Sequence, residues 1–162
     1  MEAAFQLAFI FLLITAAISD LLTMKIPNWL SLALGLLFFP AAFLAGLHIT
    51  AIGLSAVAAL CVFVACFALF ALNVMGGGDA KLLTASALWF GLGQGLIVFL
   101  VNVAFCGGLL TLLILLIRWK SCWATDRGIR LPPSLSTAKK IPYGIAIAAG
   151  ALLAMPQLVI VA

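Results

Sequence analysis

Long apolar runs, separated by short stretches of polar residues, Gly and Pro, constrain this chain more than any other feature. Hydrophobic residues make up 67% of the 162 residues and charged residues only 7%, which lies far outside the composition of soluble globular domains. A bilayer core of about 30 Å needs about 20 apolar residues per helix. The sequence therefore predicts an all-α, polytopic membrane protein: a six-transmembrane-helix bundle forming a single membrane-embedded domain, 1–162. The expected helices are 3–19, 29–47, 51–72, 80–93, 95–117 and 141–161.

The basic residues predict the orientation of these helices. They fall only in alternate connections, after the first, third and fifth expected helices. The positive-inside rule therefore puts these three connections in the cytoplasm and both termini outside. The eight basic residues are Lys25, Lys81, Arg118, Lys120, Arg127, Arg130, Lys139 and Lys140.

Two aspartates share the predicted cytoplasmic side. Asp20 ends the first expected helix and Asp79 begins the fourth, so their carboxyl groups are expected at one membrane depth. The helix macrodipole disfavours a negative charge at Asp20 and favours one at Asp79. Carboxyl groups in such different environments can divide the roles of acid and base. The sequence thus predicts a catalytic pair, in which Asp79 is favoured as the ionised member. A third acid, Asp126, stands in a polar stretch and is expected to be solvated without a special role.

Residues that break helices stand beside both aspartates. Pro27 cannot continue a helix, and Asn28 is expected to cap the next one by accepting from its free N–H groups. Before Asp79 come three successive glycines, each of which costs about 1 kcal/mol relative to alanine inside a helix. They predict either a plain turn or a side-chain-free backbone that an extended peptide can approach. These glycines are Gly76, Gly77 and Gly78.

A third stretch with a helix-breaking residue, "KKIPYG", lies at the start of the last expected helix. Pro142 suits the first turn of that helix, and Tyr143, the only tyrosine in the chain, is expected to anchor at the membrane interface. Lys25 and Lys81 are expected to hold helix ends at the lipid headgroups.

Three stretches together resemble the prepilin peptidases of type IV pilus systems. They are "SDLLTMKIPNWLSL", "NVMGGGDAKLL", whose glycines and Asp79 match a GxGD pattern, and "KKIPYGIAIAAG". The short length is most similar to the form that serves tight-adherence pili. The resemblance implies an intramembrane aspartic endopeptidase that cuts the short basic leader from a prepilin, at the cytoplasmic face of the bacterial inner membrane. Asp20 and Asp79 match the family's catalytic aspartates. Residues expected to bind substrate or shape the site are Lys25, Pro27, Asn28, Gly76, Gly77, Gly78, Pro142, Tyr143 and Gly144.

Longer members of that family carry a cytoplasmic insert with zinc-binding cysteine pairs and also methylate the new N-terminus. This chain departs from them, because its four cysteines form no CxxC pair. Neither methyltransferase activity, nor a metal, nor a cofactor is expected. The expected partners are a prepilin, the lipid bilayer and the pilus assembly machinery, and no nucleic acid. The cysteines are Cys61, Cys66, Cys106 and Cys122.

Two other functions stay open. A small proton-coupled transporter would also carry acids within its membrane helices, although carriers usually hold their site near the bilayer midplane. In a noncatalytic assembly subunit the aspartates would only end helices. Cleavage of a prepilin without any gradient or partner separates the peptidase from both.

Overall fold

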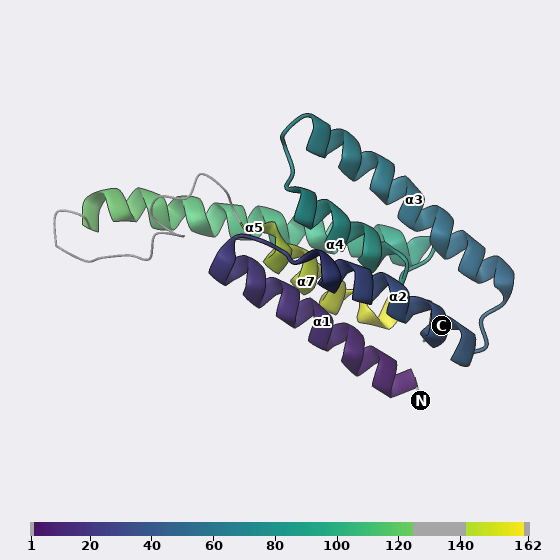
Figure 1. Ribbon diagram of the computed structural model, residues 1–162. Helices are drawn as coiled ribbons and strands as arrows, with labels where there is room; N and C mark the ends of the chain where they lie inside the picture. Colours follow the sequence, from purple (N-terminus) through teal and green to yellow (C-terminus); the bar gives the residue numbers. More distant parts are fainter. Residues whose placement is uncertain (1, 125–141, 161–162) are drawn as a thin grey trace.

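The computed structural model describes residues 2–124 and 142–160. Within these ranges the protein is helical and has no strand, as the sequence predicts. Figure 1 shows the helices gathered in one bundle, beyond which the last turns of α5 extend. The described elements are α1 (Glu2–Thr23), α2 (Asn28–Leu44), α3 (Ile49–Ala71), α4 (Gly77–Ala87), α5 (Gln94–Ala124), α7 (Tyr143–Leu153) and the 3₁₀ turn η2 (Met155–Gln157).

Three helices have the length and the apolar character to cross a membrane. These segments are Ala3–Thr23, Ile49–Ala71 and Gln94–Ile117. α2 is apolar but has 17 residues, at the lower limit of about 17–25 residues for a crossing, and α4 and α7 have only 11 each. The described part of the chain therefore supports a membrane protein with three full-length spans, and six crossings stay a prediction.

The ends of α4, α5 and α7 differ most from their predicted bounds. α5 is predicted as 95–117 but continues to Ala124. The sequence predicts 80–93, whereas α4 is Gly77–Ala87 and so begins within the glycine run. It also predicts 141–161, but α7 ends at Leu153. Pro156 explains the early end, because proline lacks an N–H donor and disfavours a helical conformation in the residue before it.

The two short helices are central in the bundle. α7 packs against α1, α4 and α5, and α4 packs against α2, α3 and α7. Most of the surface of α4 is buried, including Ala80, Leu82, Leu83 and Ala87, while Lys81 is exposed, as expected for a helix packed against several others.

An aromatic cluster anchors the end of α4. Trp89, just beyond α4, is fully buried, and its ring centroid lies 4.7 Å from that of Phe9 in α1. The Trp89 indole Nε1–H donates a hydrogen bond of 3.1 Å to the Leu34 carbonyl oxygen in α2. The C-terminal end of α4 is therefore fixed in the core, and Asp79 lies at the opposite end of this helix.

Candidate active site

Asp20 lies in the last turn of α1, where it is only 5% exposed. The Gly144 backbone N–H donates a hydrogen bond of 2.8 Å to Asp20 Oδ2. Gly144 is the second residue of α7, so its N–H is one of the first-turn donors that have no partner within the helix. A buried carboxyl group without hydrogen bonds is costly. This contact gives the Asp20 carboxyl group a hydrogen-bond partner and fixes its orientation.

Gly144 is the residue that permits this close approach. A Cβ added at Gly144 would lie 2.8 Å from Asp20 Oδ2, 3.0 Å from Asp20 Cβ and 3.0 Å from Ile26 Cδ1. Pro142 is buried and stands directly before α7, one residue ahead of the first-turn position that the sequence predicts. The third predicted stretch therefore reaches the site through Gly144, a residue that the resemblance indicates.

Asp79 lies in the first turn of α4 and is partly buried. Gly76 precedes α4 in an extended conformation, with φ −71° and ψ 142°. A Cβ added at Gly76 would lie 2.8 Å from Asp79 Oδ2, so the carboxyl group of Asp79 folds back over the Cα of Gly76. The helix macrodipole favours a negative charge at this position.

The other two glycines belong to α4 and let it approach its neighbours. A Cβ at Gly77 would lie 3.2 Å from Phe70 Cε2, and a Cβ at Gly78 would lie 3.2 Å from Ile26 Cβ. The turn before α4 therefore ends at Gly76, whereas Gly77 and Gly78 are already helical. They serve close packing, at the end of α3 and at the connection that follows α1.

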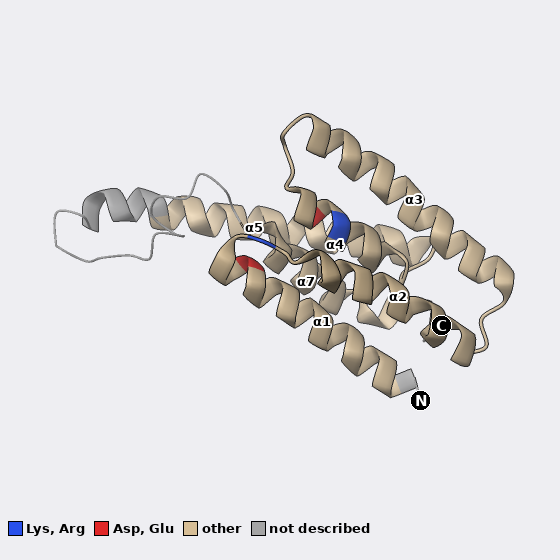
Figure 2. Cartoon of the chain, viewed as in Figure 1, with Lys and Arg blue, Asp and Glu red and all other residues tan. Residues whose placement is uncertain are grey.

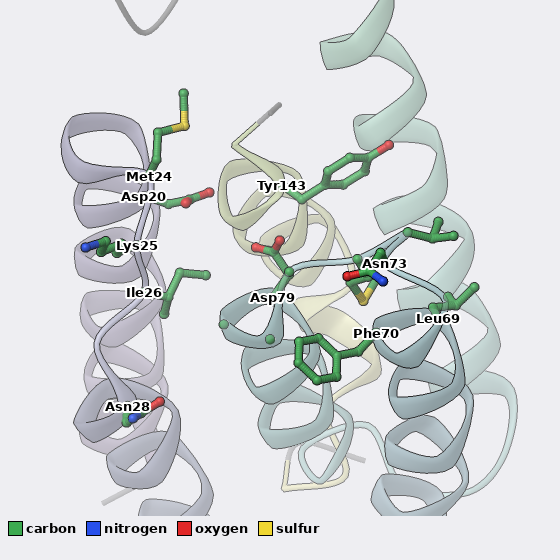
Figure 3. A pocket seen from close by; sticks show the side chains of 15 residues that line it. Asp20, Met24, Lys25, Ile26, Asn28, Leu69, Phe70, Asn73, Asp79 and Tyr143 are labelled. Atoms are coloured by element: carbon green, nitrogen blue, oxygen red, sulfur yellow. The ribbon is translucent and has the colours of Figure 1, made fainter. Parts of the chain in front are cut away.

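Asp20 and Asp79 line one pocket with a volume of about 970 Å³. Figure 3 shows their carboxyl groups facing the same space, from α1 and from the start of α4. Further predicted site residues that line it are Lys25, Asn28, Gly76, Gly77, Gly78 and Tyr143. The sequence did not predict Met24, Ile26, Leu69, Phe70, Asn73, Val74 and Met75, which also line it.

The charged side chains that the structure describes gather at this end of the bundle. They are Asp20, Lys25, Asp79 and Lys81 (Figure 2). Within the same residues, no group of three or more His, Cys, Asp or Glu could hold a metal ion. Asp126 lies outside the described residues, as do Arg127, Arg130, Lys139 and Lys140.

Asn28 does not cap α2, and that prediction is wrong. Asn28 is itself the first residue of α2, Pro27 occupies the capping position, and no side chain caps the helix. The Asn28 Oδ1 atom instead accepts a hydrogen bond of 2.9 Å from Lys81 Nζ in α4.

The connection between α1 and α2 is held by its own hydroxyl groups. Ser19 Oγ and Thr23 Oγ1 donate hydrogen bonds of 3.0 and 3.1 Å to the Lys25 carbonyl oxygen. These contacts fold the connection back onto the last turn of α1. They bring Lys25 and Ile26 to the pocket.

Two of the unpredicted pocket residues have a left-handed backbone. Met24 has φ 54° and Asn73 has φ 57°, and no other non-glycine residue in the described ranges has a positive φ. Met24 follows the end of α1, and Asn73 follows the end of α3. Asn after an apolar helix is a recognisable sign of such an end, whereas Met is not.

Tyr143 joins the pocket to α5. A Cβ added at Gly107 in α5 would lie 3.1 Å from Tyr143 Cε1, so the Tyr143 ring packs closely on that helix. The side chain is 38% exposed and lines the pocket. The predicted role as an interface anchor is not tested by this packing.

Two carboxyl groups around one open space can perform acid–base chemistry on a bound group. When such groups lie close together they share a proton, so that one acts as base and the other as acid. Water held between them is the natural nucleophile. The arrangement thus fits hydrolysis of a polar bond.

The chain matches a known protein family. The model of the type IV leader peptidase family matches residues 7–112, more than half of the chain. The matched segment contains both Asp20 and Asp79 and ends before α7. No curated protein and no solved structure matches the chain.

Proposed function

The chain belongs to the type IV leader peptidase family, and from that premise we propose that it is an intramembrane aspartic endopeptidase with a prepilin as its substrate. The single observation that best supports an aspartic mechanism is that Asp20 and Asp79, from separate helices, line one pocket. The proposed reaction removes the short basic leader of the prepilin at the cytoplasmic face of the bacterial inner membrane.

In the proposed mechanism one carboxylate removes a proton from a water molecule, which attacks the scissile carbonyl carbon. The other carboxyl group, protonated, donates a hydrogen bond to the developing oxyanion. It then delivers a proton to the leaving amine. The Gly144 N–H holds Asp20 Oδ2, so that Asp20 keeps a fixed orientation through these steps.

The pocket has the size and lining that a short peptide segment requires. Its volume of about 970 Å³ compares with about 300–1,000 Å³ for typical small-molecule sites. Apolar side chains from the end of α3, such as Leu69 and Phe70, line it beside the two acids. A peptide can therefore place side chains against apolar surface while its carbonyl group meets the carboxyl groups.

We assign the pocket to the cytoplasmic side because Lys25 lines it, Lys81 contacts Asn28 beside it, and basic residues favour the cytoplasm. Both termini are then outside. A proton-coupled transporter is the weaker candidate, because its site would lie near the midplane, whereas these acids stand at helix ends.

Mass spectrometry of a prepilin incubated with the purified protein tests the proposal. The wild type should release the leader without a gradient or a partner protein, and should leave the new N-terminus unmethylated. Asp20→Asn and Asp79→Asn should each lower the rate by about 10²- to 10⁴-fold. The matched control Asp126→Asn should cleave like the wild type. Full processing by either of the first two variants would contradict the aspartic mechanism.

A further inference from the structure

A side-chain hydrogen bond joins the two segments that carry the aspartates. Lys81 Nζ in α4 donates to Asn28 Oδ1, at 2.9 Å. Lys81 follows Asp79 by two positions within the same helix, and Asn28 begins α2 after the connection that leaves Asp20. The bond therefore spans the elements on the two sides of the pocket.

A second contact supports the same junction independently. A Cβ at Gly78 would lie only 3.2 Å from Ile26 Cβ, so the first turn of α4 lies directly against the connection between α1 and α2. Lys81 stands about one helical turn further along α4. The contacts of Gly78 and Lys81 lie at different positions along α4. Together they fix both the rotation of α4 about its axis and its distance from the connection between α1 and α2.

The stability gained from this hydrogen bond is small, because both side chains are exposed and such bonds contribute little net free energy in water. Its geometry matters more. α4 has 11 residues, and the aromatic cluster around Trp89 fixes its far end. The near end, which carries Asp79, depends on short contacts of this kind.

We infer that the Lys81–Asn28 hydrogen bond is a positioning contact, which sets the carboxyl group of Asp79 against that of Asp20 for attack by water. Lys81 does not touch the reacting atoms in this account. The predicted contact of Lys81 with lipid headgroups stays a separate prediction. The inference rests on the proposed peptidase function.

Turnover measurements test the inference. Lys81→Met and Asn28→Leu should each lower kcat by about 10- to 100-fold, because small misplacements of reacting groups have effects of this size, and should leave KM nearly unchanged. The double variant should be no slower than either single variant. Lys81→Arg keeps a cationic donor and should recover most of the activity.

Multiplied losses in the double variant, or a raised KM with an unchanged kcat, would overturn the inference. Gln94→Met serves as the control, because it removes an exposed amide at the start of α5 and should keep wild-type turnover.

A second measurement does not depend on peptidase activity. Acylation of Lys81 by a water-soluble N-hydroxysuccinimide ester is followed by mass spectrometry in the wild type and in Asn28→Leu. Loss of the hydrogen bond should raise the rate about fivefold. An unchanged rate would overturn the contact itself. If no prepilin is cleaved but the acylation rate rises, the proposed function fails while the contact stands.

Discussion

Asp20 and Asp79 face one pocket, yet the protein holds them in different ways. Asp20 lies late in the 22-residue helix α1, is only 5% exposed and accepts a hydrogen bond from the Gly144 N–H. Asp79 lies in the first turn of the 11-residue helix α4, is partly buried and folds back over Gly76. Packing against α7 therefore fixes the first carboxyl group, whereas contacts around the first turn of α4 position the second.

The largest expected effect is on the Asp20 side. In Gly144→Ala the new Cβ would meet Asp20 Oδ2 at 2.8 Å and Asp20 Cβ at 3.0 Å, so α7 and α1 must separate. We expect kcat for prepilin cleavage to fall by about 10²-fold.

Gly108→Ala is the matched control, because a Cβ at Gly108 in α5 meets nothing within 4 Å. It should keep wild-type turnover. Equal activity in Gly144→Ala and Gly108→Ala would show that the Gly144 contact does not orient Asp20.

A smaller effect is expected on the Asp79 side. In Gly76→Ala the new Cβ would meet only the Asp79 side chain, with Oδ2 at 2.8 Å, so a shift of that side chain makes room without moving a helix. A rotamer shift of this kind costs about 0.5–1.5 kcal/mol, which corresponds to a loss of up to about tenfold in kcat. Measured beside Gly144→Ala, a larger loss in Gly76→Ala would reverse the comparison between the two sides.

The smallest effect concerns the left-handed residues, one on each side of the pocket. Met24→Gly should relieve backbone strain of about 1–2 kcal/mol, offset by about 0.5–1 kcal/mol because glycine gains freedom in the unfolded chain. Asn73→Gly should change the free energy of unfolding less, since Asn tolerates this conformation. Thermal unfolding in detergent measures both variants. A larger gain in Asn73→Gly would contradict the assignment of strain to Met24.

The sequence predicts α1, α2 and α3 closely, but it misplaces the C-terminal ends of α4, α5 and α7. α1 and α3 come from apolar runs long enough to have no other stable form in a membrane, and their bounds lie near the predicted ones. α4 begins within glycines that disfavour helix in isolation, so packing against Phe70 and Ile26 decides its start. Such tertiary effects leave no trace in the local pattern.

The sequence indicates which two acids meet at the pocket, but not the contacts that hold them there. Asp20 and Asp79 stand out as rare acids beside helix-breaking residues. The hydrogen bond between Gly144 and Asp20 joins residues 124 positions apart, and no periodicity indicates it. Asn28 shows the same limit, because a local rule assigns it to a helix cap while the folded chain provides Lys81 as its partner.

The most direct test of a catalytic pair compares the rates at which Asp20→Asn, Asp79→Asn and the double variant cleave a prepilin. Residues that act as one catalytic unit have strongly non-additive effects. If Asp20 and Asp79 form such a unit, each single variant loses as much activity as the double variant, and all three share the same residual rate. A single variant that cleaves within about tenfold of the wild-type rate, well short of the loss expected for an acid–base group, would contradict it.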